Sequence, residues 1–128
     1  MKKVLIADDE PNILILMEQI LEELEEENEI LILTARNGTE ALEIIQKEQP
    51  DLVFLDVMMP QMSGLEVCEQ VKQTLKIADI YIILLTARGQ AFDRDNGIAV
   101  GADLYITKPF RPKEVLKKSK EILGINQV

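Results

Sequence analysis

Histidine is absent from this sequence of 128 residues, and cysteine and aromatic residues are scarce. Without histidine, the chain cannot build a His-based catalytic triad or a zinc site with imidazole ligands. Cys68 is the only cysteine, which excludes an intramolecular disulfide, and it lies in a helical pattern rather than in a metal-binding cluster. No apolar run approaches the roughly 20 residues of a membrane-spanning helix. The apolar run Val4–Ala7 is also too short for a signal peptide, so we expect a cytoplasmic protein.

The formal net charge is −9, with 23 acidic residues against 14 basic ones. Such a field repels phosphate backbones and anionic membrane surfaces, so we expect neither direct nucleic-acid binding nor membrane association. Much of the excess lies between Glu18 and Glu29, which we interpret as the solvated face of one helix. The length suits one domain. We expect that domain to span residues 1–124, with 125–128 as a tail or the start of a linker.

Five short apolar runs predict strands at Val4–Ala7, Ile30–Leu33, Leu52–Leu55, Ile80–Leu85 and Leu104–Ile106. None of the runs alternates with polar residues, so both faces of each strand should be buried. This is typical of parallel strands that are covered by helices on both sides.

Helical patterns separate the predicted strands. They predict helices that begin near Pro11, at Asn37-Gly38, near Ser63 and shortly before Val115, and Gly124 should end the last. The segment Ala91–Val100 is short, charged and interrupted by Gly97, so this fifth helix should be the least stable. The alternation predicts an α/β fold: a doubly wound, five-stranded parallel sheet of order 2-1-3-4-5 with five helices.

Polar residues stand where four of the predicted strands end. Asp8 and Asp9 follow the first strand, Asp56 the third, Thr86 the fourth and Lys108 the fifth. In this fold, ligands bind beyond the carboxyl ends of the strands, and neighbouring strands would make Asp56 face Asp8 and Asp9. Each residue alone has an ordinary explanation, as a helix cap, a turn residue or a surface lysine. It is their convergence at one edge that indicates a site.

The residue types at this edge suit phosphoryl transfer. Three clustered carboxylates repel one another unless a cation neutralises them, and Mg²⁺ prefers oxygen ligands. A carboxylate held beside Mg²⁺ can attack a phosphoryl group and form an acyl phosphate. The metal ion, the ammonium group of Lys108 and the hydroxyl group of Thr86 could each contact one phosphoryl oxygen.

The segments VLIADDE, LDVMMPQMSG, LLTA and YITKPF, in this order and spacing, resemble the receiver domains of bacterial two-component response regulators. The resemblance covers essentially the whole chain. It implies that Asp56 is the phosphoacceptor. Asp9 would bind Mg²⁺ directly, Asp8 would bind it mainly through water, and the backbone carbonyl group of Met58 would supply a further ligand.

The resemblance also implies a switch. Thr86 would turn toward the phosphoryl group, Lys108 would pair with it, and Tyr105 would move inward as the aromatic switch residue. The surface around residues 87–110 would shift as a result. The Lys108–Pro109 peptide bond would be cis. Met58 and Arg88 occupy positions that tune the lifetime of the acyl phosphate in the family.

The partners that the resemblance implies are a sensor histidine kinase or phosphotransfer protein and a downstream effector protein or domain. Met58 with Thr86-Ala87-Arg88 is similar to receivers of winged-helix transcription factors, which dimerise through the last strand and its flanking helices. Arg94, Glu114 and Lys118 could contribute to such a homodimer, although Leu104 replaces an acidic residue common there. The chain is either a single-domain regulator or a receiver cut from a longer protein.

Three alternative functions remain open. An aspartyl-nucleophile phosphatase usually has a second acid two residues after the nucleophile, where this chain has Met58. A flavodoxin-like binding module would need a phosphate-binding loop after the first strand, but Ala7-Asp8-Asp9-Glu10 is anionic and would repel phosphate. A receiver-like docking scaffold that is never phosphorylated is the third possibility.

Overall fold

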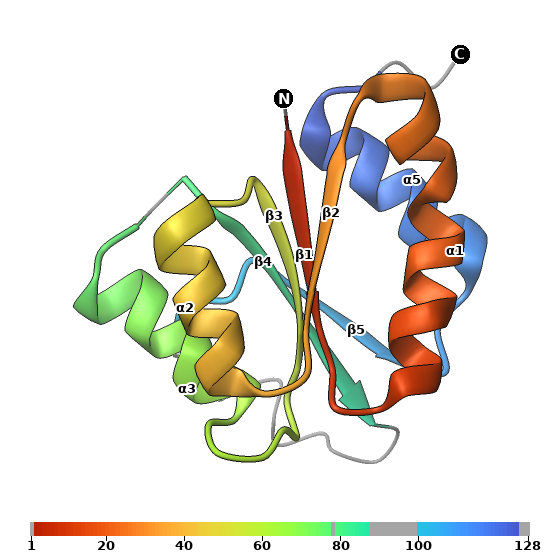
Figure 1. The fold of residues 1–128 in the computed structure, drawn as a ribbon. Helices are drawn as coiled ribbons and strands as arrows, with labels where there is room; N and C mark the ends of the chain where they lie inside the picture. The colour runs from red at the N-terminus through yellow and green to blue at the C-terminus, as the bar shows by residue number, and fades with distance from the viewer. Residues whose placement is uncertain (1, 78, 88–99, 126–128) are drawn as a thin grey trace.

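The computed structural model describes residues 2–77, 79–87 and 100–125, which form a parallel sheet covered by helices (Figure 1). The sheet has five strands in the order β2-β1-β3-β4-β5, and every pair of neighbours is parallel. The strands are β1 (Lys3–Ala7), β2 (Leu31–Ala35), β3 (Leu52–Asp56), β4 (Tyr81–Ala87) and β5 (Leu104–Lys108). The predicted fold class and strand order are confirmed.

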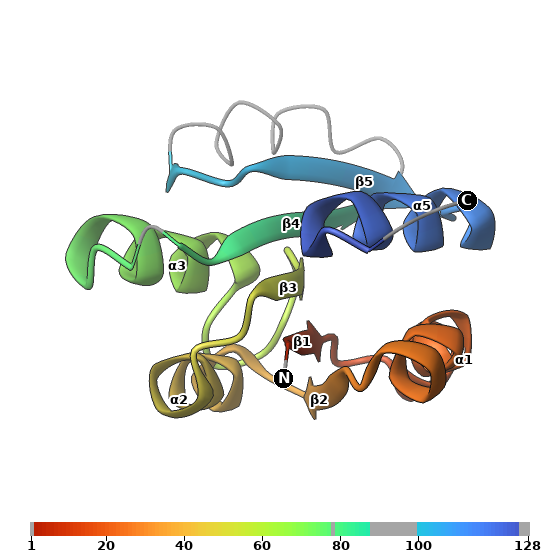
Figure 2. The same cartoon turned by 90° about the horizontal axis from the view of Figure 1, so that it is seen from above.

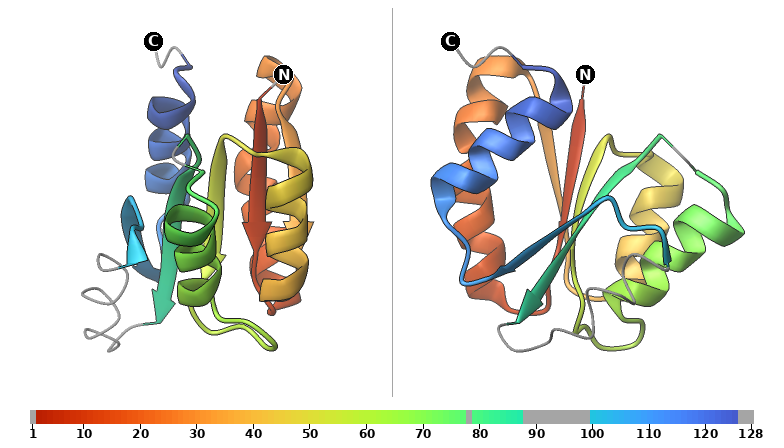
Figure 3. Two further views of the ribbon diagram at one scale, coloured as in Figure 1. Left: turned by 90° about the vertical axis from the view of Figure 1, so that its left-hand side faces the viewer. Right: turned by 180° about the vertical axis from the view of Figure 1, so that it is seen from behind.

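The helices lie in two layers, one on each face of the sheet. They are α1 (Pro11–Asn28), α2 (Gly38–Glu48), α3 (Gly64–Glu69), which continues as a π-helical segment over Gln70–Thr74, and α5 (Pro112–Leu123). Helices α1 and α5 cover one face and α2 and α3 the other (Figures 2 and 3). The described residues thus hold four α-helices where five were predicted. The fifth, expected at 91–100, lies outside them except for Val100. None of the described helices is long and apolar enough to cross a membrane.

Capping residues set the helix ends as predicted. The side chain of Asn37 accepts a hydrogen bond from the backbone N–H of Glu40, and Ser63 accepts one from Glu66 in the same way. Pro11 begins α1, where a missing N–H costs least. Gly124 ends α5 with φ at 71°, a left-handed conformation that glycine adopts without strain.

The core is divided by the sheet into two apolar clusters. One lies under α2 and α3, and the other under α1 and α5. Strands β1 and β3 are buried almost throughout, whereas β2 and β5 are largely half-buried. The prediction that every strand is buried on both faces is therefore wrong for these two. They are the edge strands, and only a central strand has neighbours on both sides.

Candidate functional site

The alternation of side chains along the strands brings three charged residues to one face of the sheet. Ile6 in β1 and Phe54 in β3 pack toward α1 and α5. Since every second residue points the same way, Asp8 and Asp56 project from that face at the carboxyl edge. Lys108 occupies the equivalent position at the end of β5, two residues beyond the buried Ile106.

Thr86 approaches the same edge from the opposite face. It follows Leu84 by two residues, and Leu84 packs into the cluster under α2 and α3. In the register of β3 and β4, Asp56 pairs with Leu85, so Thr86 lies one residue beyond the partner of Asp56. Its side chain is buried. Tyr105 is half-buried against the same cluster and pairs with Leu84 rather than with a residue of the acidic edge.

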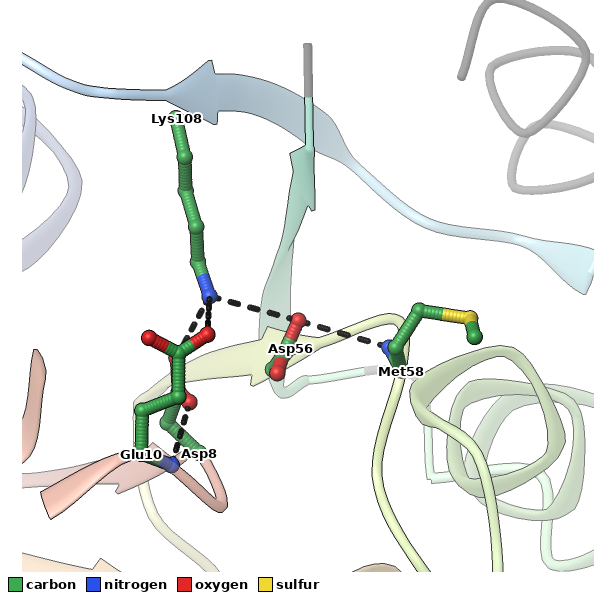
Figure 4. Close-up of polar contacts among 5 residues, drawn as sticks. All are labelled: Asp8, Glu10, Asp56, Met58 and Lys108. Carbon is green, nitrogen blue, oxygen red and sulfur yellow. Dashed lines mark hydrogen bonds and ion pairs between the residues drawn. The ribbon is translucent and has the colours of Figure 1, made fainter. Parts of the chain in front are cut away.

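The ammonium group of Lys108 connects the acidic residues (Figure 4). Its Nζ donates a hydrogen bond of 2.9 Å to Asp8 Oδ2 and lies 3.5 Å from Asp56 Oδ1 and 3.7 Å from Glu10 Oε1. Asp8 is completely buried and Asp56 is 5% exposed. Buried carboxylates of this kind need a positive partner, and Lys108 supplies one.

Four carboxylates form a compact oxygen-rich cluster. Asp8, Asp9, Glu10 and Asp56 each offer a carboxylate oxygen, and these atoms all lie within 4.8 Å of one another. Asp8 and Asp56 are buried, and Asp9 and Glu10 are exposed. Hard oxygen donors that are partly open to solvent suit Mg²⁺, which keeps several of its waters. The sequence predicts three of these residues, Asp8, Asp9 and Asp56, as site residues, whereas Glu10 is identified by the structure.

Burial and repulsion perturb the pKa values of the site. Burial, followed by the negative charge of Asp8, raises the pKa of Asp56 to about 7, although Lys108 and the Met58 N–H act in the opposite direction. Burial on its own would lower the pKa of Lys108. The hydrogen bond to Asp8 and the charges of Asp56, Asp8 and Glu10 outweigh that effect and raise it. Lys108 therefore stays cationic at neutral pH, while Asp56 is poised near its titration point.

Backbone contacts hold the loop after Asp56 in place. The N–H of Met58 donates to Asp56 Oδ1 at 3.3 Å, and the N–H of Gly64 donates to the Val57 carbonyl oxygen at 3.0 Å. A Cβ atom at Gly64 would collide with the backbone carbonyl group of Asp56. Glycine at this position therefore lets the start of α3 close against the end of β3. Met58 is 63% exposed, and its side chain points away from the Asp56 carboxylate (Figure 4).

The structure brings four of the predicted site residues together and places a fifth at the border of the cluster. Asp8, Asp9, Asp56 and Lys108 meet at one edge, and Thr86 borders it. The Lys108–Pro109 peptide bond is cis. The positions of Arg88 and Arg94 lie outside the described residues.

Comparison with known proteins agrees with this geometry. The family model for the response regulator receiver domain matches residues 4–120. The alkaline phosphatase synthesis transcriptional regulatory protein PhoP of Bacillus subtilis is 41% identical over 127 residues, which cover 99% of this chain and 50% of PhoP. The probable transcriptional regulator ycf27 of Porphyra purpurea is 43% identical over 122 residues, covering 95% of this chain and 47% of that protein.

A solved structure supports the same assignment. The receiver domain protein from Methanospirillum hungatei superposes with a TM-score of 0.85 at 31% sequence identity, covering 97% of this chain and 94% of that chain. The chain therefore belongs to the response regulator receiver domain family of two-component systems. It spans about half the length of the curated relatives that it matches.

Proposed function

We propose that this chain is a phosphorylation-dependent signalling switch. Asp56 accepts a phosphoryl group from a phosphohistidine of a sensor histidine kinase or phosphotransfer protein. The observation that carries the proposal is the arrangement at one sheet edge: a buried Asp56 carboxylate beside Asp8, with the ammonium group of Lys108 at 3.5 Å. These 128 residues contain no histidine, so the phosphohistidine must lie outside them.

The transfer is a substitution at phosphorus. A carboxylate oxygen of Asp56 attacks the phosphorus atom, the P–N bond to the donor imidazole breaks, and the imidazole leaves with the electron pair. Lys108 lies where it can pair with one phosphoryl oxygen once it releases Asp8. Water later attacks the same phosphorus atom, which releases inorganic phosphate and restores the Asp56 carboxylate.

The acidic cluster fits a bound Mg²⁺. Asp8, Asp9 and Asp56, together with the backbone carbonyl group of Met58, would hold the ion, in agreement with the compact set of carboxylate oxygens. When bound, Mg²⁺ offsets the negative charge of the carboxylates and of the phosphoryl oxygens. The chain's own contribution is to fix these ligands at the ends of β1 and β3.

Phosphorylation changes the partners of Lys108 and Thr86. Lys108 exchanges its contact with Asp8 for one with the phosphoryl group, and the Thr86 hydroxyl group approaches from the other face of the sheet. Tyr105 lies on that same face and packs inward when Thr86 moves. The surface around residues 87–110 then favours a second state, and the phosphoryl group biases the equilibrium between the two.

The output reaches a downstream partner or an attached effector. Two relatives carry the names of transcriptional regulators and are about twice as long as this chain. We propose that the receiver domain covers residues 1–124, with 125–128 as a tail or linker, and that it works in the cytoplasm. Dimerisation through β5 and its flanking helices, with Glu114 and Lys118, is part of the same proposal.

The test is intact-protein mass spectrometry after incubation with a small phosphodonor, with and without Mg²⁺. We expect one added phosphoryl group that requires Mg²⁺ and disappears in Asp56→Asn. Asp51→Asn is the matched control, because it removes a carboxylate at the opposite edge of the sheet and should leave labelling intact. An adduct that survives in Asp56→Asn would contradict the proposal. Steady turnover of an external phosphoester would instead favour the phosphatase alternative, and absence of both adduct and Mg²⁺ binding would favour a docking scaffold.

A further inference from the structure

The outer side of β2 is an edge of the sheet with unpaired backbone groups. Strand β2 pairs with β1 and ends the sheet, with α1 over one face and α2 over the other (Figure 2). The N–H of Leu31 donates to the carbonyl oxygen of Lys2 at 2.9 Å, in the direction of β1. Because backbone groups alternate along a strand, those of Ile32 and Thr34 point outward. Among the residues that the structure describes, these two form no backbone hydrogen bond with any other segment on that side.

This edge lacks the features that usually protect an open strand. Natural edge strands often carry lysine, proline or a bulge, which keep another strand from pairing with them. The sequence of β2 is Leu-Ile-Leu-Thr-Ala, without a charged residue or a proline. Its first four residues are half-buried, and its register with β1 runs without a bulge from Leu31 to Ala35. The edge is therefore open to the addition of a further strand.

A row of glutamates on α1, the acidic row Glu18, Glu22 and Glu25, runs beside this edge. Glu23 lies on the other flank of α1, where it forms an ion pair of 2.9 Å with Lys120 of α5. Since α5 lies toward β4 and β5, the acidic row points past β2 (Figure 2). The row extends for about 10 Å along α1, which runs antiparallel to β2 and contacts it. Within the described part of the chain, none of its three carboxylates forms an ion pair.

We propose that the β2 edge binds an extended segment of a partner protein in which basic and apolar side chains alternate. The segment extends the sheet by one strand and pairs its backbone with the outward groups of Ile32 and Thr34. Side chains of an added strand point alternately to the two faces of the sheet. Those on the α1 face meet the acidic row, which favours lysine or arginine. Those on the α2 face lie beside Leu33, which is half-buried in the cluster under α2 and α3, and this favours apolar residues.

A second copy of this chain does not fit the same edge. Strand β2 has no basic residue, and antiparallel pairing of two such strands about a two-fold axis would place the two α1 helices side by side. Their acidic rows would then face each other, and the net charge of −9 on each copy adds to the repulsion. The acidic row therefore repels another copy and attracts a basic strand. Strand β5 is the opposite edge of the sheet, so this surface is separate from the proposed dimer.

The test is an NMR titration of the ¹⁵N-labelled chain with a synthetic peptide of about eight residues that alternates lysine and valine, long enough to span β2. We expect saturable binding with the largest amide shifts at Ile32 and Thr34, because their N–H groups gain acceptors. A peptide of the same composition, with its lysines and valines in two separate blocks, should bind about tenfold more weakly or worse, because it cannot present one charged face and one apolar face.

Two variants separate backbone pairing from charge. Thr34→Pro removes an outward N–H and leaves the ladder with β1 intact, so it should weaken peptide binding about tenfold or more, whereas Thr34→Val keeps the N–H and should bind normally. Glu18→Gln with Glu25→Gln should also weaken binding about tenfold. Glu43→Gln with Glu69→Gln removes the same charge from exposed positions of α2 and α3 and should have little effect.

Circular dichroism shows whether each variant folds, and the charge variants decide the matter if Thr34→Pro does not fold. Absence of peptide binding, equal binding of the block peptide, or largest shifts away from β2 would each overturn the proposal. Shifts of the β2 amides when the chain alone is concentrated would also overturn it, because they would show that a second copy occupies the edge.

Discussion

Replacing Asp56 with asparagine should stabilise the metal-free domain at high pH. Burial and the charge of Asp8 raise the pKa of Asp56 from 3.8 to about 7, so ionising this carboxyl group opposes folding. One pKa unit corresponds to about 1.4 kcal/mol, and a shift of about three units sets a ceiling of about 4 kcal/mol. The substitution also removes the contact of Lys108 with Asp56, although its hydrogen bond to Asp8 remains. We therefore expect a net gain of about 1–3 kcal/mol at pH 8.

The sign of the pH dependence follows from the direction of the shift. Between pH 3.8 and about 7, the folded chain retains a proton on Asp56 that the unfolded chain has lost. The free energy of unfolding of the unmodified domain therefore falls as pH rises through this window, and the contribution levels off above it. The advantage of Asp56→Asn should be small near pH 4 and largest at pH 8.

Urea unfolding followed by circular dichroism measures this difference, in the presence of a chelator, at several pH values from 4 to 8. Asp51→Asn is the control, since it removes a carboxylate that lies away from Asp8 and Lys108. Adding Mg²⁺ should stabilise the unmodified domain more than Asp56→Asn and so reduce the gap between them. A variant that is no more stable than the unmodified domain at pH 8 would contradict this prediction, as would an advantage that is the same at both ends of the pH range.

Three further predictions concern single residues. Lys108→Ala should still accept a phosphoryl group at Asp56 but lose the conformational response, so that amide chemical shifts in residues 87–110 change little on phosphorylation; a normal response would contradict the role of Lys108. Gly64→Ala should lower the free energy of unfolding by about 1–3 kcal/mol, because its Cβ would meet the Asp56 backbone; urea unfolding equal to that of the unmodified domain would show that the loop can adjust. Cys68 should resist alkylation at pH 8, because burial raises the pKa of its thiol to about 12 and the side chain is inaccessible; mass spectrometry should show labelling only when urea opens the fold, and rapid labelling of the native domain would oppose this.

Much of the fold and of the site could be predicted because local patterns encode them. Unbroken apolar runs such as Leu52–Leu55 require burial on both faces, and the alternation with helices then requires a parallel sheet. The polar residues after those runs, Asp8, Asp56 and Lys108, must meet at one edge whatever the details of the helices. The structure brings Lys108 within ion-pair distance of both carboxylates.

The remaining features depend on contacts between distant segments. The half-burial of β2 and β5 follows from their position at the sheet edges, which no single run reveals. Glu10 reads as an ordinary acidic residue near a helix start, and its place in the cluster follows from the turn after β1. The ion pair of Lys72 with Asp103 joins the π-helical segment to the residue before β5, and its spacing has no local signature.

The central claim is that Asp56 itself carries the phosphoryl group. The most direct measurement is to treat the phosphorylated protein with borohydride, which reduces an aspartyl phosphate to homoserine, and to locate the modified residue by peptide mass spectrometry. We expect homoserine at position 56 and unmodified aspartate at positions 8 and 9. Modification at another carboxylate, or a phosphoryl group that resists reduction because it is attached to a hydroxyl group, would contradict it.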